Sequence, residues 1–158
     1  MKLLRLLLIA ALCPLLLGPL LPQAAALEEA LVQAETDFTS EQELPDTCTE
    51  TSLGNLCADA ARESCSADFA LLPAGAMEGT LAHGAVFASD LERIIPQDTS
   101  LCTVSISAAQ LFGLLETGVS HLVTNQAERI DPERSDWDCF PQVSGFSWTY
   151  DVSAPVGE

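Results

Sequence analysis

The stretch from Glu50 to Arg62 places the strongest constraint on the fold, because its apolar residues recur at helical spacing. The residues that fall on one face of such a helix are Leu53, Leu56, Cys57, Ala60 and Ala61. Thr51 or Ser52 can cap the start, since a hydroxyl there accepts a hydrogen bond from an N–H group of the first turn. The pattern therefore predicts an amphipathic helix over this stretch.

Three other segments have the pattern of β-strands. Phe69 to Leu72 is a short apolar run that suits a buried strand, ended by Pro73 and followed by a loop at Ala74 to Ala76. Leu101 to Ile106 alternates between two faces, as the residues of a strand do. The same alternation, with hydroxyl residues between aromatic ones, predicts a strand at Phe146, Trp148 and Tyr150.

Two capping boxes predict further helices. They are Ser89 with Glu92, and Ser107 with Gln110. Pro96 stops the first of these helices, whereas the second is expected to run to about Leu122. Leu27 to Phe38 fits either a short helix or a strand. Interspersed helices and strands indicate an α/β class, with α+β as the alternative.

The first 26 residues have the features of a secretory signal peptide. Lys2 and Arg5 form a basic start, Leu6 to Leu21 an apolar middle, and Ala24 to Ala26 a cleavage site, so the secreted chain is expected to begin at Leu27. A signal anchor is the alternative, because the apolar stretch is long. The residues that interrupt it as a spanning helix are Pro14, Gly18, Pro19 and Pro22. Secretion after cleavage is therefore the prediction.

The chain is strongly acidic, with 23 acidic and 6 basic residues and a formal net charge of -17. Loss of the leader removes Lys2 and Arg5 and leaves 4 basic residues against 23 acidic ones, a net charge of -19. Such a field repels nucleic acids and anionic lipid surfaces, so neither is expected as a partner after cleavage. The 132 residues that remain suffice for one domain.

Cysteine usage fits an oxidising destination. Five cysteines remain after cleavage: Cys48, Cys57, Cys65, Cys102 and Cys139. They allow two disulfide bonds and one leftover thiol, which could pair with another chain. They include no closely spaced pair, and only two histidines accompany them, so no zinc site is expected.

An acidic cluster near the C-terminus offers oxygen ligands for calcium. Its members are Asp131, Glu133, Asp136 and Asp138. The cluster lacks the central glycine and the terminal glutamate of an EF-hand loop. A solvated loop is therefore the expectation.

Three segments together resemble the C-terminal domain of secreted 5'-nucleotidases. They are Glu50 to Arg62, Ala67 to Leu81 and Phe140 to Asp151, linked through Gly84, Asp90 and Pro96. The resemblance covers about residues 31 to 157 and implies a sandwich of helices and mixed sheet. It divides the chain into a leader at 1–26, an extension with a first strand at 27–48, and a partial domain at 49–158. Residues 151–158 match the middle of the family's domain, so the domain is expected to be incomplete at its C-terminus.

The resemblance also implies what chemistry to expect. Members of the family hydrolyse nucleotides at two divalent metal ions held by an N-terminal metallophosphoesterase domain, to which this sequence shows no likeness. The chain contains two histidines, His83 and His121, which cannot supply such a ligand set. Neither a metal nor another cofactor, nor catalysis by this chain alone, is therefore expected.

The family's C-terminal domain binds the substrate, with an arginine in a glycine loop for the phosphate and a Pro-Phe-x-Asn segment for the base. The matching positions here are Gly75, Glu78, Gln97 and Thr99. Glu78 replaces the arginine and turns attraction into repulsion. Gln97 and Thr99 replace the ring and the amide. The residues that survive, with packing as their expected role, are Asn55, Asp59 and Phe140.

Two hypotheses follow from the resemblance. The first is a secreted substrate-binding domain connected with nucleotide catabolism, not catalytic on its own, with a nucleotide or nucleoside as candidate ligand. The second is an extracellular binding or structural module that kept the scaffold and lost nucleotide binding. In the second case the unpaired cysteine could link it to a partner chain.

Overall fold

The computed structural model describes residues 28–41, 49–95, 99–124, 130–131, 135–151 and 153–154. The predicted leader lies outside these residues. The strands are β1 (Val32–Ala34), β2 (Phe38–Thr39), β3 (Ala70–Pro73), β4 (Thr80–Leu81), β5 (Gly84–Val86) and β6 (Pro141–Ser144). The helices are α2 (Ser52–Cys65), the 3-10 turn η1 (Ala74–Ala76), α3 (Ala88–Ile94) and α4 (Ala108–Val119). No helix in the described part of the chain is long and apolar enough to span a membrane.

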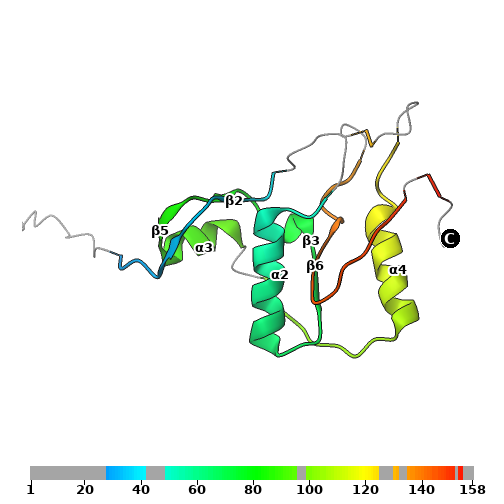
Figure 1. Cartoon of the computed structure of the whole chain (residues 1–158), viewed down its shortest axis with the longest axis horizontal. Helices are drawn as coiled ribbons and strands as arrows, with labels where there is room; N and C mark the ends of the chain where they lie inside the picture. Colours follow the sequence, from blue (N-terminus) through cyan, green and yellow to red (C-terminus); the bar gives the residue numbers. More distant parts are fainter. Residues whose placement is uncertain are drawn as a thin grey trace, which may run out of the picture.

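The main body has three layers, with the β3–β6 pair between α2 and α4 (Figure 1). A second lobe holds α3 with the pairs β1–β5 and β2–β4. All three ladders among the described residues are antiparallel. The mixture of helices with small sheets confirms the expected fold class, although the expected mixed sheet consists here of separate antiparallel pairs.

Helix α2 confirms the most clearly predicted element, and three of the five residues predicted to face inward are buried. Thr51 caps it, because the Gly54 N–H donates to the Thr51 hydroxyl at 3.0 Å. The buried residues are Leu53, Gly54, Cys57, Ala58 and Ala61. Leu56 is 36% exposed and Ala60 is also exposed, so the predicted stripe is rotated. Gly54 and Ala58 face inward, and because both are small, the sheet can approach the helix backbone closely.

Strand β6 lies between α2 and α4 in the main body, and the sequence pattern did not reveal it. All four of its residues are buried, since α2 contacts the strand on one side and α4 on the other. A strand covered on both faces loses the alternation by which strands are recognised. It pairs with β3 from Ala70 opposite Ser144 to Pro73 opposite Pro141. Gly118 of α4 lies so close that a Cβ there would come within 2.6 Å of Pro141 Cγ.

Gln142 fastens β6 to the start of α2. Its side chain is fully buried, and its Oε1 accepts a hydrogen bond of 2.7 Å from the Thr51 N–H. A Cβ added to Gly54 would lie 1.9 Å from the same oxygen. The amide therefore occupies the space that a side chain at position 54 would need.

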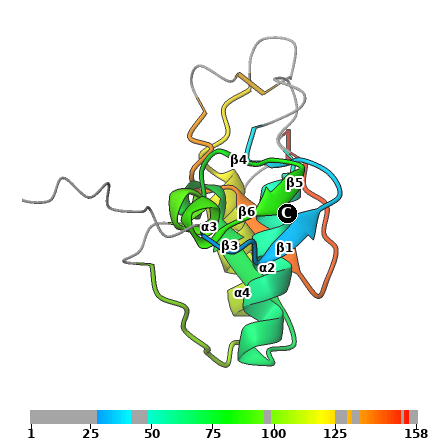
Figure 2. The same ribbon diagram turned by 90° about the vertical axis from the view of Figure 1, so that its left-hand side faces the viewer.

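Two predicted strands do not form. Leu101 to Ile106 has no ladder partner among the described residues and runs beside the layers toward α4 (Figure 2). Val104 is 68% exposed there, because an alternating pattern cannot form a strand without a neighbour. Phe146 to Tyr150 is likewise not paired within the described chain. Its aromatic residues are nevertheless half-buried while Ser147 and Thr149 are exposed, so the predicted alternation of faces is present.

The two capping boxes had different outcomes. Ser107 and Gln110 cap α4 as predicted, although the helix ends at Val119, before Leu122. Helix α3 begins earlier than predicted, with the Asp90 carboxylate accepting from the Phe87 N–H at 2.9 Å. Ser89 instead donates its N–H and hydroxyl to Glu28 at 2.8 and 2.7 Å. The hydroxyl bond lowers the pKa of Glu28 and ties the N-terminal segment to α3.

We predict that Gly54→Ala destabilises the protein by about 1–3 kcal/mol, because the new methyl group must displace the buried Gln142 amide. Gly113→Ala is the matched control: it lies in α4 with nothing within 4 Å of an added Cβ. That substitution should stabilise the fold by about 0.5–1 kcal/mol, the helical preference for alanine over glycine. Urea unfolding measures both. Equal effects of the two substitutions would refute the close approach of β6 to α2.

Candidate functional site

The loop that the resemblance assigns to the family's phosphate site is held by backbone hydrogen bonds. Strand β3 ends at Pro73, and the predicted loop forms the single turn η1. The Ala74 N–H donates to the Phe140 carbonyl and the Gly75 N–H to the Asp138 carbonyl, each at 2.9 Å. The Glu78 N–H donates to the Ile94 carbonyl at 3.0 Å. Three backbone bonds therefore fix this turn between β6 and α3.

Beside this turn lies a pocket of about 410 Å³, which we call the glycine-loop pocket. Its lining residues are Ser40, Ala74, Gly75, Met77, Glu78, Trp137 and Asp138. The two charged residues among them, Glu78 and Asp138, are both acidic and both exposed. An anion entering this pocket would meet carboxylates, so its electrostatics oppose phosphate binding.

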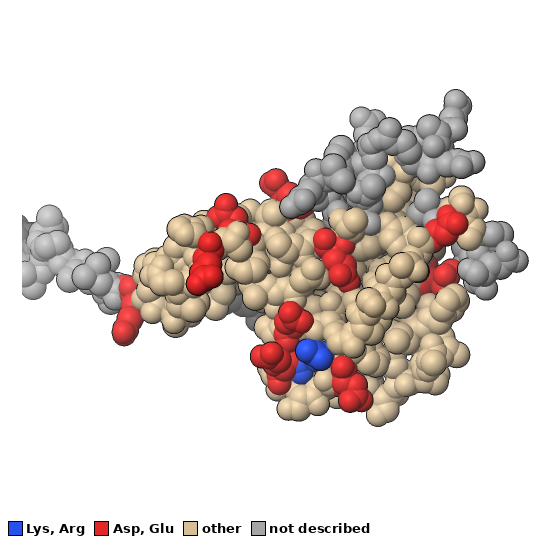
Figure 3. Space-filling view, in the orientation of Figure 1, with Lys and Arg blue, Asp and Glu red and all other residues tan. Residues whose placement is uncertain are grey.

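The described arginines lie elsewhere. Arg93 forms an ion pair with Asp90, its guanidinium nitrogen 2.7 Å from the carboxylate. The side chain of Arg62 lies near Gly145, where an added Cβ would be 3.1 Å from Arg62 Cδ. Neither residue lines the glycine-loop pocket. Figure 3 shows the same imbalance on one face of the molecule, with acidic side chains spread widely and few basic ones.

Gly75 has a packing role in this structure. A Cβ at this position would lie 2.8 Å from the Asp138 Cβ and 3.2 Å from the Asp138 Cα. The glycine therefore permits the close approach of η1 to the segment before β6. Of the two positions matched to the base-binding segment, Gln97 lies outside the described residues, and Thr99 is exposed and does not line the glycine-loop pocket.

The three residues that the resemblance predicts to survive occupy different environments. Phe140 is 1% exposed and forms a second core with Ile130, against which Trp137, Trp148 and Tyr150 pack. Asp59 accepts a hydrogen bond from the Ser144 hydroxyl and so joins the exposed side of α2 to β6. The side chain of Asn55 is exposed, with no hydrogen bond within the described residues.

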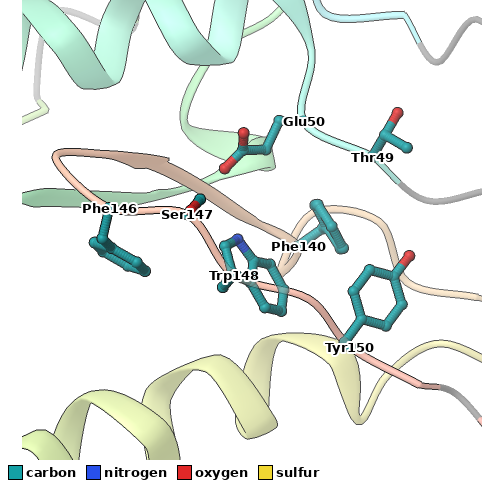
Figure 4. A pocket seen from close by; sticks show the side chains of 7 residues that line it. All are labelled: Thr49, Glu50, Phe140, Phe146, Ser147, Trp148 and Tyr150. Atoms are coloured by element: carbon teal, nitrogen blue, oxygen red, sulfur yellow. The ribbon is translucent and has the colours of Figure 1, made fainter.

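A second pocket, which sequence reasoning did not identify, is lined in part by Phe140. It has a volume of about 240 Å³, and we call it the aromatic pocket. Its lining residues are Thr49, Glu50, Phe140, Phe146, Ser147, Trp148 and Tyr150 (Figure 4). The alternating aromatic residues were visible in the sequence, but Glu50 precedes α2 and is brought to them only by the fold.

The four described candidate cysteines are free thiols: Cys57, Cys65, Cys102 and Cys139. Burial raises the pKa of the Cys57 thiol. Cys48 lies outside the described residues, so disulfide bonding stays a prediction. Among the described residues no group of three or more histidine, cysteine or carboxylate side chains is placed to hold a metal ion. One member of the predicted acidic cluster, Glu133, also lies outside them.

Comparison with known proteins places these features in context. The family model of the 5'-nucleotidase C-terminal domain matches residues 30–158. The crystal structure of a 5'-nucleotidase precursor from Thermus thermophilus superimposes on 95% of this chain with a TM-score of 0.65 and 22% sequence identity. The chain spans 26% of that protein's length. A search of curated proteins gave no match.

Removing the side chain of Asp59 should lower the stability of the protein more than removing that of Asn55 on the same helix. Asp59→Ala deletes the acceptor of the Ser144 hydroxyl, so we expect a loss of about 1–2 kcal/mol of stability. Asn55→Ala, on the same helix, should change stability by less than about 0.5 kcal/mol, because the side chain is exposed. Thermal and urea unfolding measure both. A larger effect at Asn55 than at Asp59 would contradict the packing role assigned to Asp59.

Proposed function

The chain belongs to the family of 5'-nucleotidase C-terminal domains, and from that membership we propose a secreted, non-catalytic protein that keeps the family's scaffold and has lost its nucleotide site. The observation that carries the proposal is the acidic glycine-loop pocket. Glu78 and Asp138 line it together, without a basic residue among its described lining. Beside the pocket, the Ala74 N–H donates to the Phe140 carbonyl and holds the turn in place.

The size of the charge repulsion, compared with that of base stacking, favours complete loss of nucleotide binding over weakened binding. Two unit charges about 5 Å apart repel by about 1 kcal/mol in water and about 3 kcal/mol at an effective dielectric constant of about 20. A phosphate dianion beside Glu78 and Asp138 would experience several such repulsions. Stacking of a base contributes only about 1–3 kcal/mol. Stacking elsewhere on the chain would not offset the repulsion.

The absence of catalysis rests on the ligand inventory of the sequence. A two-metal phosphoesterase site needs several histidine and carboxylate ligands that converge on one point. The sequence holds two histidines, His83 and His121, and both are exposed in separate parts of the fold. We therefore do not propose that this chain has the activity of the much longer Thermus protein.

The alternative is the substrate-side half of a split nucleotidase, whose metal centre another chain would supply. Family membership favours it, and the acidic pocket opposes it. The two candidates make opposite predictions about nucleotide binding, so binding decides between them without knowledge of the partner.

We predict that AMP at millimolar concentration gives no binding heat with the wild-type protein and that no inorganic phosphate is released. Glu78→Arg should introduce measurable, salt-sensitive binding of inorganic phosphate, because the pocket then holds a guanidinium. Glu78→Gln removes the negative charge without adding a donor fork and is the matched control, for which binding should stay undetectable. Calorimetry measures binding by the wild type and both variants, and a phosphate assay measures release of inorganic phosphate. Wild-type binding of AMP would support the split nucleotidase, and release of phosphate would refute the proposal.

Secretion is tested separately. Expressed in a secretory host, the chain should appear in the medium with Leu27 as its first residue, because Ala24 to Ala26 form the cleavage site. Intact mass spectrometry reads the start of the chain directly. Retention in the membrane fraction with Met1 still present would show a signal anchor instead.

A further inference from the structure

The aromatic pocket combines ring surfaces with one carboxylate. Four of its lining residues are aromatic, and Glu50 is the charged one. Its volume of about 240 Å³ falls below the range of about 300–1,000 Å³ that is usual for drug-sized ligands. The pocket is therefore suited to a small group rather than to a whole nucleotide.

The arrangement of the rings disfavours a planar base as ligand. The centroids of Trp148 and Tyr150 are 5.3 Å apart, and each ring lies 5.7 Å from Phe140. At these distances the three rings are in contact with one another. No slot remains between two of them for a base to enter, so a ligand must lie on the surface that the cluster presents.

Glu50 has a fixed orientation beside these rings. Its Oε1 accepts a hydrogen bond of 3.1 Å from the Val143 N–H, which anchors the carboxylate to β6. In Figure 4 the carboxylate points toward Ser147 and Trp148. A carboxylate presents only acceptor oxygens and a negative charge, so it attracts cations and repels phosphates.

We propose that the aromatic pocket binds a small organic ammonium cation, such as a methylated ammonium head group. Trp148 and Tyr150 are partly exposed whereas Phe140 is buried, so the negative quadrupoles of these two rings attract such a cation, and the effect is strongest for tryptophan. Glu50 adds a full negative charge at the edge of the rings. The formal net charge of -17 raises the local concentration of cations around the whole protein. Ring faces, carboxylate and overall charge thus select the same class of ligand.

Fluorescence of Trp148 tests this proposal. The chain has two tryptophans, so Trp137→Phe leaves Trp148 as the single reporter. Choline should change its emission saturably. The neutral analogue of choline, in which a tert-butyl group replaces the trimethylammonium group, has the same shape and should bind at least about tenfold more weakly, since the cation–π attraction is lost. Equal binding of the two compounds, or no response to millimolar choline, would overturn the proposal.

Glu50→Gln isolates the contribution of the carboxylate. The amide oxygen can still accept from the Val143 N–H, so the substitution removes charge and keeps the anchoring bond. We expect choline affinity to fall about fivefold or more. Glu63→Gln, which removes the same charge from an exposed position far along α2, should leave the affinity unchanged. Equal losses in both variants would show that only the overall charge matters and would refute the site.

Discussion

The contact between the Gln142 amide and the start of α2 organises the fold. The amide accepts from the Thr51 N–H, and it fits only because position 54 has no side chain. It brings β6 against the helix and lets Glu50, the residue before the cap, reach the Val143 N–H. Because β6 pairs with β3, the same contact sets the position of the turn η1 that follows β3. The scaffold and both pockets therefore depend on one buried side chain.

The glycine-loop pocket and the aromatic pocket share no lining residue and differ in chemistry. The Phe140 carbonyl holds the turn beside the glycine-loop pocket, whereas the Phe140 ring lines the aromatic pocket. The glycine-loop pocket presents Glu78 and Asp138 on an otherwise uncharged lining. The aromatic pocket presents rings and Glu50. Both favour cations over anions, which is the reverse of what a phosphate-binding domain requires.

Two of the three predicted helix caps were confirmed, whereas the cap at Ser89 and the exact buried face of α2 were not. Thr51 and Ser107 cap their helices as expected, because a hydroxyl and an N–H group within three residues need no distant partner. Strands were less predictable. Leu101 to Ile106 has a strand pattern without a described partner, and Pro141 to Ser144 forms a strand without a strand pattern. In both cases the neighbours decide, and those neighbours come from distant parts of the sequence.

The candidate site shows the same division. The sequence drew attention to Glu78 as the position expected to hold the family's arginine, whereas its proximity to Asp138 and the pairing of Glu50 with the aromatic residues required the fold. The central claim is that the family's scaffold holds the turn at Gly75 while the pocket beside it repels anions. Amide NMR of the isotopically labelled protein tests it most directly, by following the N–H signals of Gly75, Met77 and Glu78 during addition of AMP. Unchanged signals at millimolar AMP are predicted, and a saturable shift of these three signals would contradict the claim.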